Sequence, residues 1–251
     1  RKYPIADYSL TPTVAIVDPA LVLTVPGFVA ADTGMDVLTH ATEAYVSQMA
    51  SDYTDGLALQ AIKLVFENLE SSVKNADFHS REKMHNASTI AGMAFANAFL
   101  GISHSMAHKI GAQFHTVHGR TNAILLPYVI RYNGTRPAKT ATWPKYNYYR
   151  ADEKYQDIAR MLGLPASTPE EGVASYAKAV YELGERVGIE MNFKAQGVDE
   201  KEWKEHSREL AFLAYEDQCS PANPRLPMVD HMQEIIEDAY YGYKERPGRL
   251  K

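Results

Sequence analysis

Residues 101–119 read GISHSMAHKIGAQFHTVHG, and this stretch holds four of the nine histidines of the 251-residue chain. The four lie between residues 104 and 118, where even scattering would place about half a histidine. His104 and His108 are four residues apart, so on a helix they project from one face. Small residues that would let helices approach closely precede them: Ala91, Gly92, Ala94, Ala96, Ala98 and Gly101. The stretch therefore predicts helices packed tightly around a cluster of imidazoles.

A second segment supplies a carboxylate and another imidazole. Residues 36–43 read DVLTHATE, in which Asp36 and His40 lie one helical turn apart and Glu43 follows on the same side. An isolated Asp-x-x-x-His pair is often only a surface pair on a helix. The two clusters together favour a metal site, because an acid and several imidazoles suit Fe(II) or Zn(II). Spacing alone leaves open which of the four clustered histidines bind the metal.

Composition restricts the class of protein. Hydrophobic residues make up 45% and charged residues 23% of the chain, which is typical of a globular domain and excludes a disordered one. The net charge of −5 gives no basic surface that would favour nucleic acid or an anionic membrane. Cys219 is the only cysteine, which excludes an internal disulfide and a cage of thiolate metal ligands. No apolar run approaches the ~20 residues that span a bilayer, and we expect a cytoplasmic protein.

Helical patterns follow one another along most of the chain. Thr24-Val25-Pro26 is typical of a helix start, and Thr168-Pro169 is another. Asp52 or Thr54 is placed to cap a helix whose apolar face contains Ala58, Ala61, Ile62, Val65 and Leu69. Further helices are predicted over 81–99, 103–113, 119–132, 151–162, 170–187, 199–216 and 228–241.

Two segments depart from the helical pattern. Thr13–Val17 is a short β-branched run that predicts a strand, although no second strand follows to pair with it. Residues 133–150 are aromatic and polar, and predict a surface loop. The predicted fold class is therefore mainly α, a helical domain preceded by a short strand segment.

Three motifs together resemble the iron-dependent (group III) alcohol dehydrogenases: DVLTHATE at 36–43, HSMAH at 104–108, and His118-Gly119. KYPIADY at 2–8 and DQCSPANPR at 217–225 resemble more narrowly the alcohol dehydrogenase half of the bifunctional aldehyde-alcohol dehydrogenases. The resemblance covers essentially the whole chain. It implies that the helical domain is the metal-binding bundle of such an enzyme.

The resemblance also implies a ligand set. The four metal ligands of the family match Asp36, His40, His104 and His118. Two departures adjoin the last ligand, since Val117 stands where family members usually carry proline and Arg120 where an apolar residue is common. Neither departure removes a ligand.

Other site residues follow from the same resemblance. His108 matches a histidine near the substrate that is proposed to help proton transfer. Thr33 and Phe95 match positions that line the cofactor cleft. His115 matches no ligand, which implies a structural or supporting role.

The implied activity is the NAD-linked interconversion of a short aldehyde, such as acetaldehyde, and its primary alcohol, such as ethanol, as in ethanol fermentation. The implied metal is Fe(II), with Zn(II) as the alternative. Family members bind NAD(H) mainly through an N-terminal domain with a Gly-Gly-Gly-Ser loop, whereas no two glycines are adjacent here. We therefore expect residues 1–24 to be the tail of that dinucleotide-binding domain and residues 25–251 to be the helical catalytic domain.

The expected partners follow from the same assignment. They are the missing dinucleotide-binding domain, a fused aldehyde dehydrogenase domain, the small substrate, and further copies of the chain in a homo-oligomer. Because the phosphate loop is absent, we expect the 251-residue chain by itself to have no turnover.

Two other functions fit the residues. The chain could be a non-catalytic helical interaction module, with buried histidines as polar contacts and partner surfaces around Trp143 and Tyr240–Tyr243. Half-buried packing is the simpler explanation of those tyrosines. The chain could also be a zinc-dependent enzyme that resembles polyol or glycerol dehydrogenases. Metal analysis separates the module from both enzymes.

Overall fold

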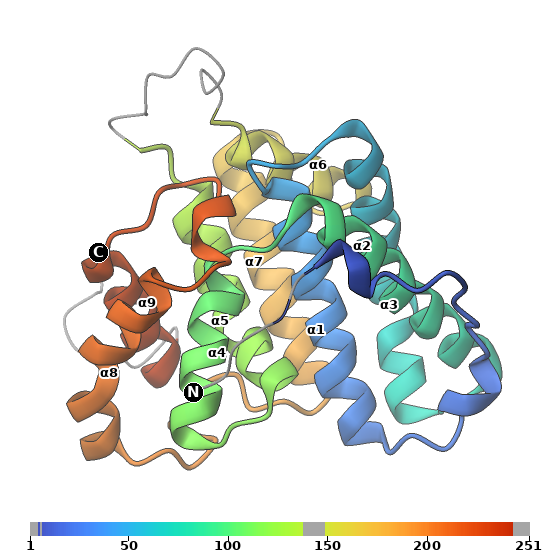
Figure 1. The fold of residues 1–251 in the computed structure, drawn as a ribbon, viewed down its shortest axis with the longest axis horizontal. Coiled ribbons are helices and arrows are strands. Elements are labelled where there is room, and N and C mark those ends of the chain that lie inside the picture. The colour runs from blue at the N-terminus through green and yellow to red at the C-terminus, as the bar shows by residue number, and fades with distance from the viewer. Residues whose placement is uncertain (1–4, 6, 138–148, 243–251) are drawn as a thin grey trace.

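The computed structural model describes residues 5, 7–137 and 149–242, and these residues form a bundle of helices (Figure 1). The α helices are α1 (Gly27–Val46), α2 (Asp52–Lys74), α3 (Phe78–Ala98), α4 (Ile102–Phe114), α5 (His118–Gly134), α6 (Ala151–Met161), α7 (Pro169–Arg186), α8 (Glu200–Tyr215) and α9 (Val229–Tyr241). Short 3-10 turns lie at Tyr8–Leu10, Pro19–Val22 and Ser220–Ala222. The described part of the chain contains no β strand, which confirms the mainly α fold class.

The buried side chains form two hydrophobic clusters that share α5. One cluster joins α1, α2, α3, α6 and α7, and the other joins α4, α8 and α9. Ala123, Leu126 and Ile130 of α5 belong to the first cluster, whereas Ile124 and Val129 belong to the second. Figure 1 shows α4 and α5 between α8 and α9 on one side and α1, α2 and α3 on the other. The predicted metal ligands lie on α1, α4 and α5, where the two clusters meet.

Local sequence determines where several helices begin. Ser51 caps α2, and its hydroxyl and that of Thr54 form a reciprocal capping box, so the cap is Ser51 rather than the predicted Asp52 or Thr54. The predicted apolar face of α2 is confirmed, since all five of its residues are buried. Thr168 caps α7 with Pro169 in the first turn, as the sequence predicts.

Residues 13–17 do not form the predicted strand. The segment carries neither helix nor strand, and the side chains of Val14 and Ile16 are 74% and 87% exposed. A strand needs a neighbour to pair its backbone groups, and the described residues provide none. The β-branched run therefore excludes a helix here but does not make a sheet.

The predicted loop at 133–150 begins later than expected. Helix α5 continues through Gly134, and the Asn133 side chain is buried, where it exchanges two hydrogen bonds with Asn223 (2.8 and 3.1 Å). A polar residue at the end of a helical pattern is typical of a loop. Here the Asn223 amide, distant in sequence, pairs the polar atoms of the Asn133 side chain, so the helix continues. Trp143 and the other residues from 138 to 148 lie outside the described residues, as does Tyr243.

None of the described helices is both long enough and apolar enough to span a bilayer alone. Helices α3 and α4, bent by 107° relative to one another, have the length and composition to do so only as a pair.

Candidate metal centre

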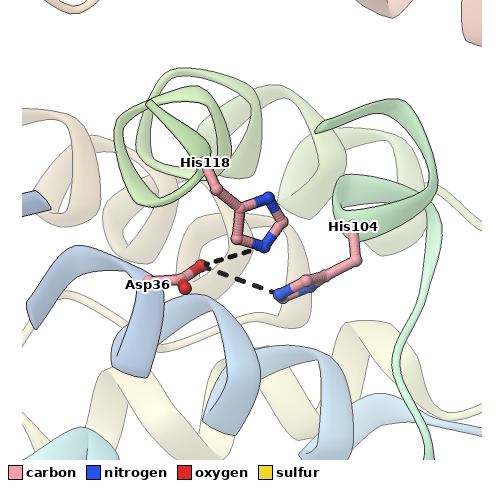
Figure 2. A group of neighbouring side chains, drawn as sticks. All are labelled: Asp36, His104 and His118. Atoms are coloured by element: carbon pink, nitrogen blue, oxygen red, sulfur yellow. Dashed lines mark ion pairs between the residues drawn. The ribbon is translucent and has the colours of Figure 1, made fainter. Parts of the chain in front are cut away.

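Three of the four predicted ligands meet in space. Asp36 comes from the middle of α1, His104 from the first turn of α4, and His118 is the first residue of α5. Figure 2 shows that these side chains point toward one another. The Nε2 atoms of His104 and His118 lie 3.7 and 3.9 Å from Asp36 Oδ1. These separations are close to the roughly 3.4 Å between ligand atoms of a tetrahedral metal with bonds of about 2.1 Å.

His40 lies beside this group without joining the set of closest ligand atoms. Its ring stacks on the ring of His104, with centroids 4.5 Å apart, and on the other predicted neighbour, Phe95, at the same distance. Within this group, the ligand atoms that lie within 4.8 Å of one another belong to Asp36, His104 and His118. His40 therefore stays a prediction as the fourth ligand, one helical turn from Asp36.

The charges at the centre suit a cation. Burial by itself raises the pKa of Asp36, but the neighbouring imidazoles, that of His40 foremost, and the Asn122 amide outweigh it, so the pKa lies below its usual range. Burial and the neighbouring His104 lower the pKa of His40 to about 3. Near pH 7 the carboxylate is therefore ionised and the His40 ring is neutral. These are the protonation states in which both groups bind metal.

One buried nitrogen provides a direct test of whether a metal fits. His104 Nε2 is fully buried and has no hydrogen-bond partner within the described residues, although it faces Asp36. An unsatisfied polar atom inside a protein costs about 1–3 kcal/mol unless something binds it. Carboxylate and imidazole donors suit Fe(II) and Zn(II). A divalent cation at this point would satisfy the nitrogen, so the residues fit the group.

Asn122 is a site residue that the sequence reasoning missed. Its Nδ2 donates to Asp36 Oδ1 (2.8 Å) and lies 3.3 Å from His118 Nε2, so one amide touches two predicted ligands. It lies one turn after His118 on α5, and this i, i+4 spacing is the signal that could have identified it.

His108 faces a carboxylate that the sequence did not assign. His108 Nδ1 lies 3.2 Å from Asp217 Oδ2, and Lys109 Nζ lies 2.7 Å from the same oxygen. Burial by itself raises the pKa of Asp217, but the hydrogen bonds from His108 and Lys109 outweigh it and hold the pKa well below its usual range. In the sequence, the motif at 217–225 supports the family resemblance but does not by itself indicate a contact with His108.

Cys219 adjoins this pair without completing a second metal site. Atoms of His108, Asp217 and Cys219 lie within 4.8 Å of one another. Burial and the Asp217 charge raise the pKa of the Cys219 thiol, which keeps it protonated. The Lys109 ammonium already neutralises Asp217, so the geometry favours an imidazole–carboxylate pair over a second cation.

Close backbone contact brings α5 against α1. A Cβ atom at Gly119 would lie 2.2 Å from the carbonyl oxygen of Asp32, so only glycine allows this approach. The next residue, Arg120, makes two hydrogen bonds to the buried Asp32 carboxylate (2.9 and 3.1 Å). The departure at Arg120 therefore has a structural role, since it fastens the start of α5, and with it His118, to α1.

The remaining predicted residues lie around this centre. Phe95 is in α3, partly buried against His40. Thr33 is exposed on α1, one turn before Asp36, and its hydroxyl donates to Val29 O (2.8 Å). His115 is exposed and ends α4 in the left-handed conformation (φ 55°). No observation assigns a cofactor contact to Thr33 or Phe95, and both stay predictions.

Comparison with known proteins agrees with this architecture. The aldehyde-alcohol dehydrogenase of Streptococcus pneumoniae (serotype 2, strain D39) is 97% identical over all 251 residues, which make up 28% of its length. The bifunctional aldehyde-alcohol dehydrogenase of Escherichia coli K12 is 44% identical over 96% of this chain and 28% of its own. The chain thus spans less than a third of these relatives.

Solved structures give the same result. The iron-containing alcohol dehydrogenase of Thermococcus thioreducens matches 95% of this chain and 57% of its own, with a TM-score of 0.83 and 36% identity. The sulfoacetaldehyde reductase of Bifidobacterium kashiwanohense, solved with NAD+, matches 95% of this chain and 57% of its own, with a TM-score of 0.79 and 29% identity. A profile described as the Fe-containing alcohol dehydrogenase family, C-terminal, matches residues 30–240. The chain therefore belongs to the iron-containing alcohol dehydrogenase family.

Proposed function

We propose that this chain is the metal-binding catalytic part of an NAD-linked alcohol dehydrogenase that interconverts a short aldehyde, such as acetaldehyde, and its primary alcohol, such as ethanol. The observation that supports this most directly is the buried, unsatisfied His104 Nε2 that faces Asp36 and His118. The family assignment supports the same reaction class.

The proposed metal ligands are Asp36, His40, His104 and His118, and the proposed metal is Fe(II), with Zn(II) as the alternative. When bound, the cation supplies Lewis-acid stabilisation of negative charge on the substrate oxygen. Asn122 donates a 2.8 Å hydrogen bond to the Asp36 carboxylate, so the orientation of this proposed ligand is fixed before the cation binds.

His108 is the proposed proton carrier. The ionised Asp217 accepts hydrogen bonds only, so the proton of the neutral His108 ring lies on Nδ1 and Nε2 keeps its lone pair. In alcohol oxidation, Nε2 would take the hydroxyl proton, and NAD+, when bound, would supply the hydride acceptor. Imidazole suits this task because it titrates near neutrality.

The rest of the enzyme is inferred from the relatives. We propose that residues 1–24 belong to a dinucleotide-binding domain that binds most of NAD(H), with Thr33 and Phe95 lining the cofactor cleft. The exposed Val14 and Ile16 support this, because they present apolar surface for another domain to cover. We also propose a fused aldehyde dehydrogenase domain, as in the relatives of which this chain spans 28%, a homo-oligomer, and a cytoplasmic location.

Metal content tests the proposal most directly. The full-length protein, purified without chelator or nickel resin and reconstituted with Fe(II) or Zn(II), is expected to hold one equivalent per chain and to oxidise ethanol with NAD+. His118→Ala should abolish stoichiometric metal. His115→Ala is the matched control, since this nearby exposed histidine should leave metal content unchanged. Full metal content in His118→Ala would overturn the ligand assignment, and a metal-free, inactive parent would favour the interaction module.

A further inference from the structure

His104 presents its two ring nitrogens to opposite environments. Nε2 faces Asp36 and has no hydrogen-bond partner within the described residues. Nδ1 lies 2.6 Å from Glu43 Oε2, a carboxylate that is 2% exposed. Glu43 lies on α1, seven residues after Asp36, so the same helix supplies a predicted ligand and the group behind another ligand.

The start of α4 also holds the Glu43 carboxylate. Its other oxygen, Oε1, accepts a 2.7 Å hydrogen bond from the backbone N–H of Ser103, in the first turn of α4. The N-terminus of a helix carries partial positive charge and stabilises an anion. Gly101, the residue before α4, has no side-chain cap, and a Cβ there would lie 2.9 Å from Glu43 Oε1. Glu43 and Asn223, which accepts from the Ile102 backbone N–H, therefore replace a local cap, and the glycine makes room for both.

Carboxylate oxygens are hydrogen-bond acceptors. At 2.6 Å from Oε2, His104 Nδ1 is placed to donate its proton to Glu43, which leaves the lone pair on Nε2. That lone pair is the one that faces Asp36 and His118. Metal-binding histidines in proteins are held in this way by a partner on the second nitrogen.

We infer that Glu43 is a positioning residue that fixes the tautomer and the ring orientation of His104, and so prepares its Nε2 to bind the cation. This inference rests on the proposed metal site. It adds a role for a residue that touches neither the cation nor the substrate, and it explains why a fully buried acid stands next to a buried histidine.

Glu43→Gln tests the role with almost no change of shape. Ser103 N–H can only donate, so it must meet the oxygen of the new amide, and the amide NH2 then faces His104 Nδ1. Nδ1 has to accept, which moves the ring proton to Nε2 and blocks its lone pair. In the full-length protein we expect about 10- to 100-fold weaker Zn(II) or Fe(II) binding in competition with a chelator. The helical content measured by circular dichroism should remain.

The control removes a buried carboxylate elsewhere. Asp152→Asn changes a 6% exposed acid at the start of α6, which pairs with Arg136, and it should leave metal affinity unchanged. A double-mutant cycle adds a second readout: in a His104→Ala background, Glu43→Gln should have no further effect on affinity, because Glu43 acts through that ring. Additive losses would instead indicate a general structural role and overturn the inference.

The outcomes also separate this inference from the metal site itself. An unmutated protein that binds no metal contradicts the proposed function, whereas normal binding by both the parent and Glu43→Gln contradicts the role of Glu43 alone. Should Glu43→Gln fail to fold, Glu43→Asp answers the question, since its carboxylate is one methylene too short to reach His104. Weakened binding by Glu43→Asp supports the inference, and parental affinity overturns it.

Discussion

His104 and His108 lie one turn apart on α4, and both are buried with a carboxylate on Nδ1. Their surroundings otherwise differ. The partner of His104, Glu43, is held by a backbone N–H, and the far side of the ring faces a third acid, Asp36. The partner of His108, Asp217, is shared with the Lys109 ammonium.

The difference shows how one type of side-chain pair serves two purposes. Around His104 two carboxylates face the ring, and no lysine or arginine of the described residues forms an ion pair with either of them, so an added cation would relieve an excess of negative charge. Around His108 the lysine already balances the acid, which leaves the ring for the proton transfer proposed above. Neighbouring charge, and not the imidazole itself, separates the two histidines.

His104→Ala should have the largest effect. Removing a ligand, and with it the imidazole that lies between Asp36 and Glu43, is expected to weaken metal binding by more than about 100-fold, since the loss of a mere supporting group already costs 10- to 100-fold. Turnover should be lost with the metal. Elemental analysis after dialysis measures this, and a variant that retains one equivalent would remove the distinction between the two histidines.

His108→Ala should give a different pattern. We expect full metal content, together with a fall in kcat of about 10²- to 10⁴-fold, the usual range for losing a general acid or base. Kinetics of ethanol oxidation and elemental analysis of the same preparation test both statements. Loss of metal in this variant would place His108 among the ligands.

Asp217→Asn should give the smallest effect and sharpen the comparison. The amide keeps the shape but removes the charge that balances Lys109, and we expect kcat to fall about tenfold with metal retained. Stability near pH 7 should fall by about 2 kcal/mol, the worth of a hydrogen bond to a charged group. Urea unfolding measures the second effect.

The pH dependence of that stability loss has a definite sign. The pKa of Asp217 is lowered by folding, so its ionised form stabilises the fold above the unfolded pKa of about 4, and this contribution disappears as the pH falls. The stability difference between parent and Asp217→Asn should therefore shrink as the pH is lowered from 5 to 3. An equal difference at both pH values would show that charge is not its cause.

Helix positions could be predicted from the sequence because they depend on short-range spacing. The apolar stripe of α2 and the Thr168-Pro169 start of α7 are examples. Spacing placed Asp36 and the histidines of residues 104–118 in two candidate clusters. The choice of ligands among them rested on the family resemblance, and it stays a prediction.

The hydrogen-bond partners of several buried polar residues could not be predicted, because these partners lie far away in the sequence. Asp217 reaches His108 across 109 residues, and Asn133 bonds Asn223 across 90. No local sequence pattern indicates either of these contacts. The prediction of a strand at residues 13–17 was wrong for a different reason. Its β-branched pattern is local, but a strand forms only beside a neighbouring strand, and the described residues provide none.

Helix α5 is common to both hydrophobic clusters, and its first residue is His118. Disrupting the packing of either cluster would therefore also disturb the α5 side chains that belong to the other. We expect the two clusters to unfold in one thermal transition. A cation held at the head of this shared helix would add its binding energy to the whole chain. Release of the cation on heating would then coincide with the unfolding of residues that lie far from the metal site.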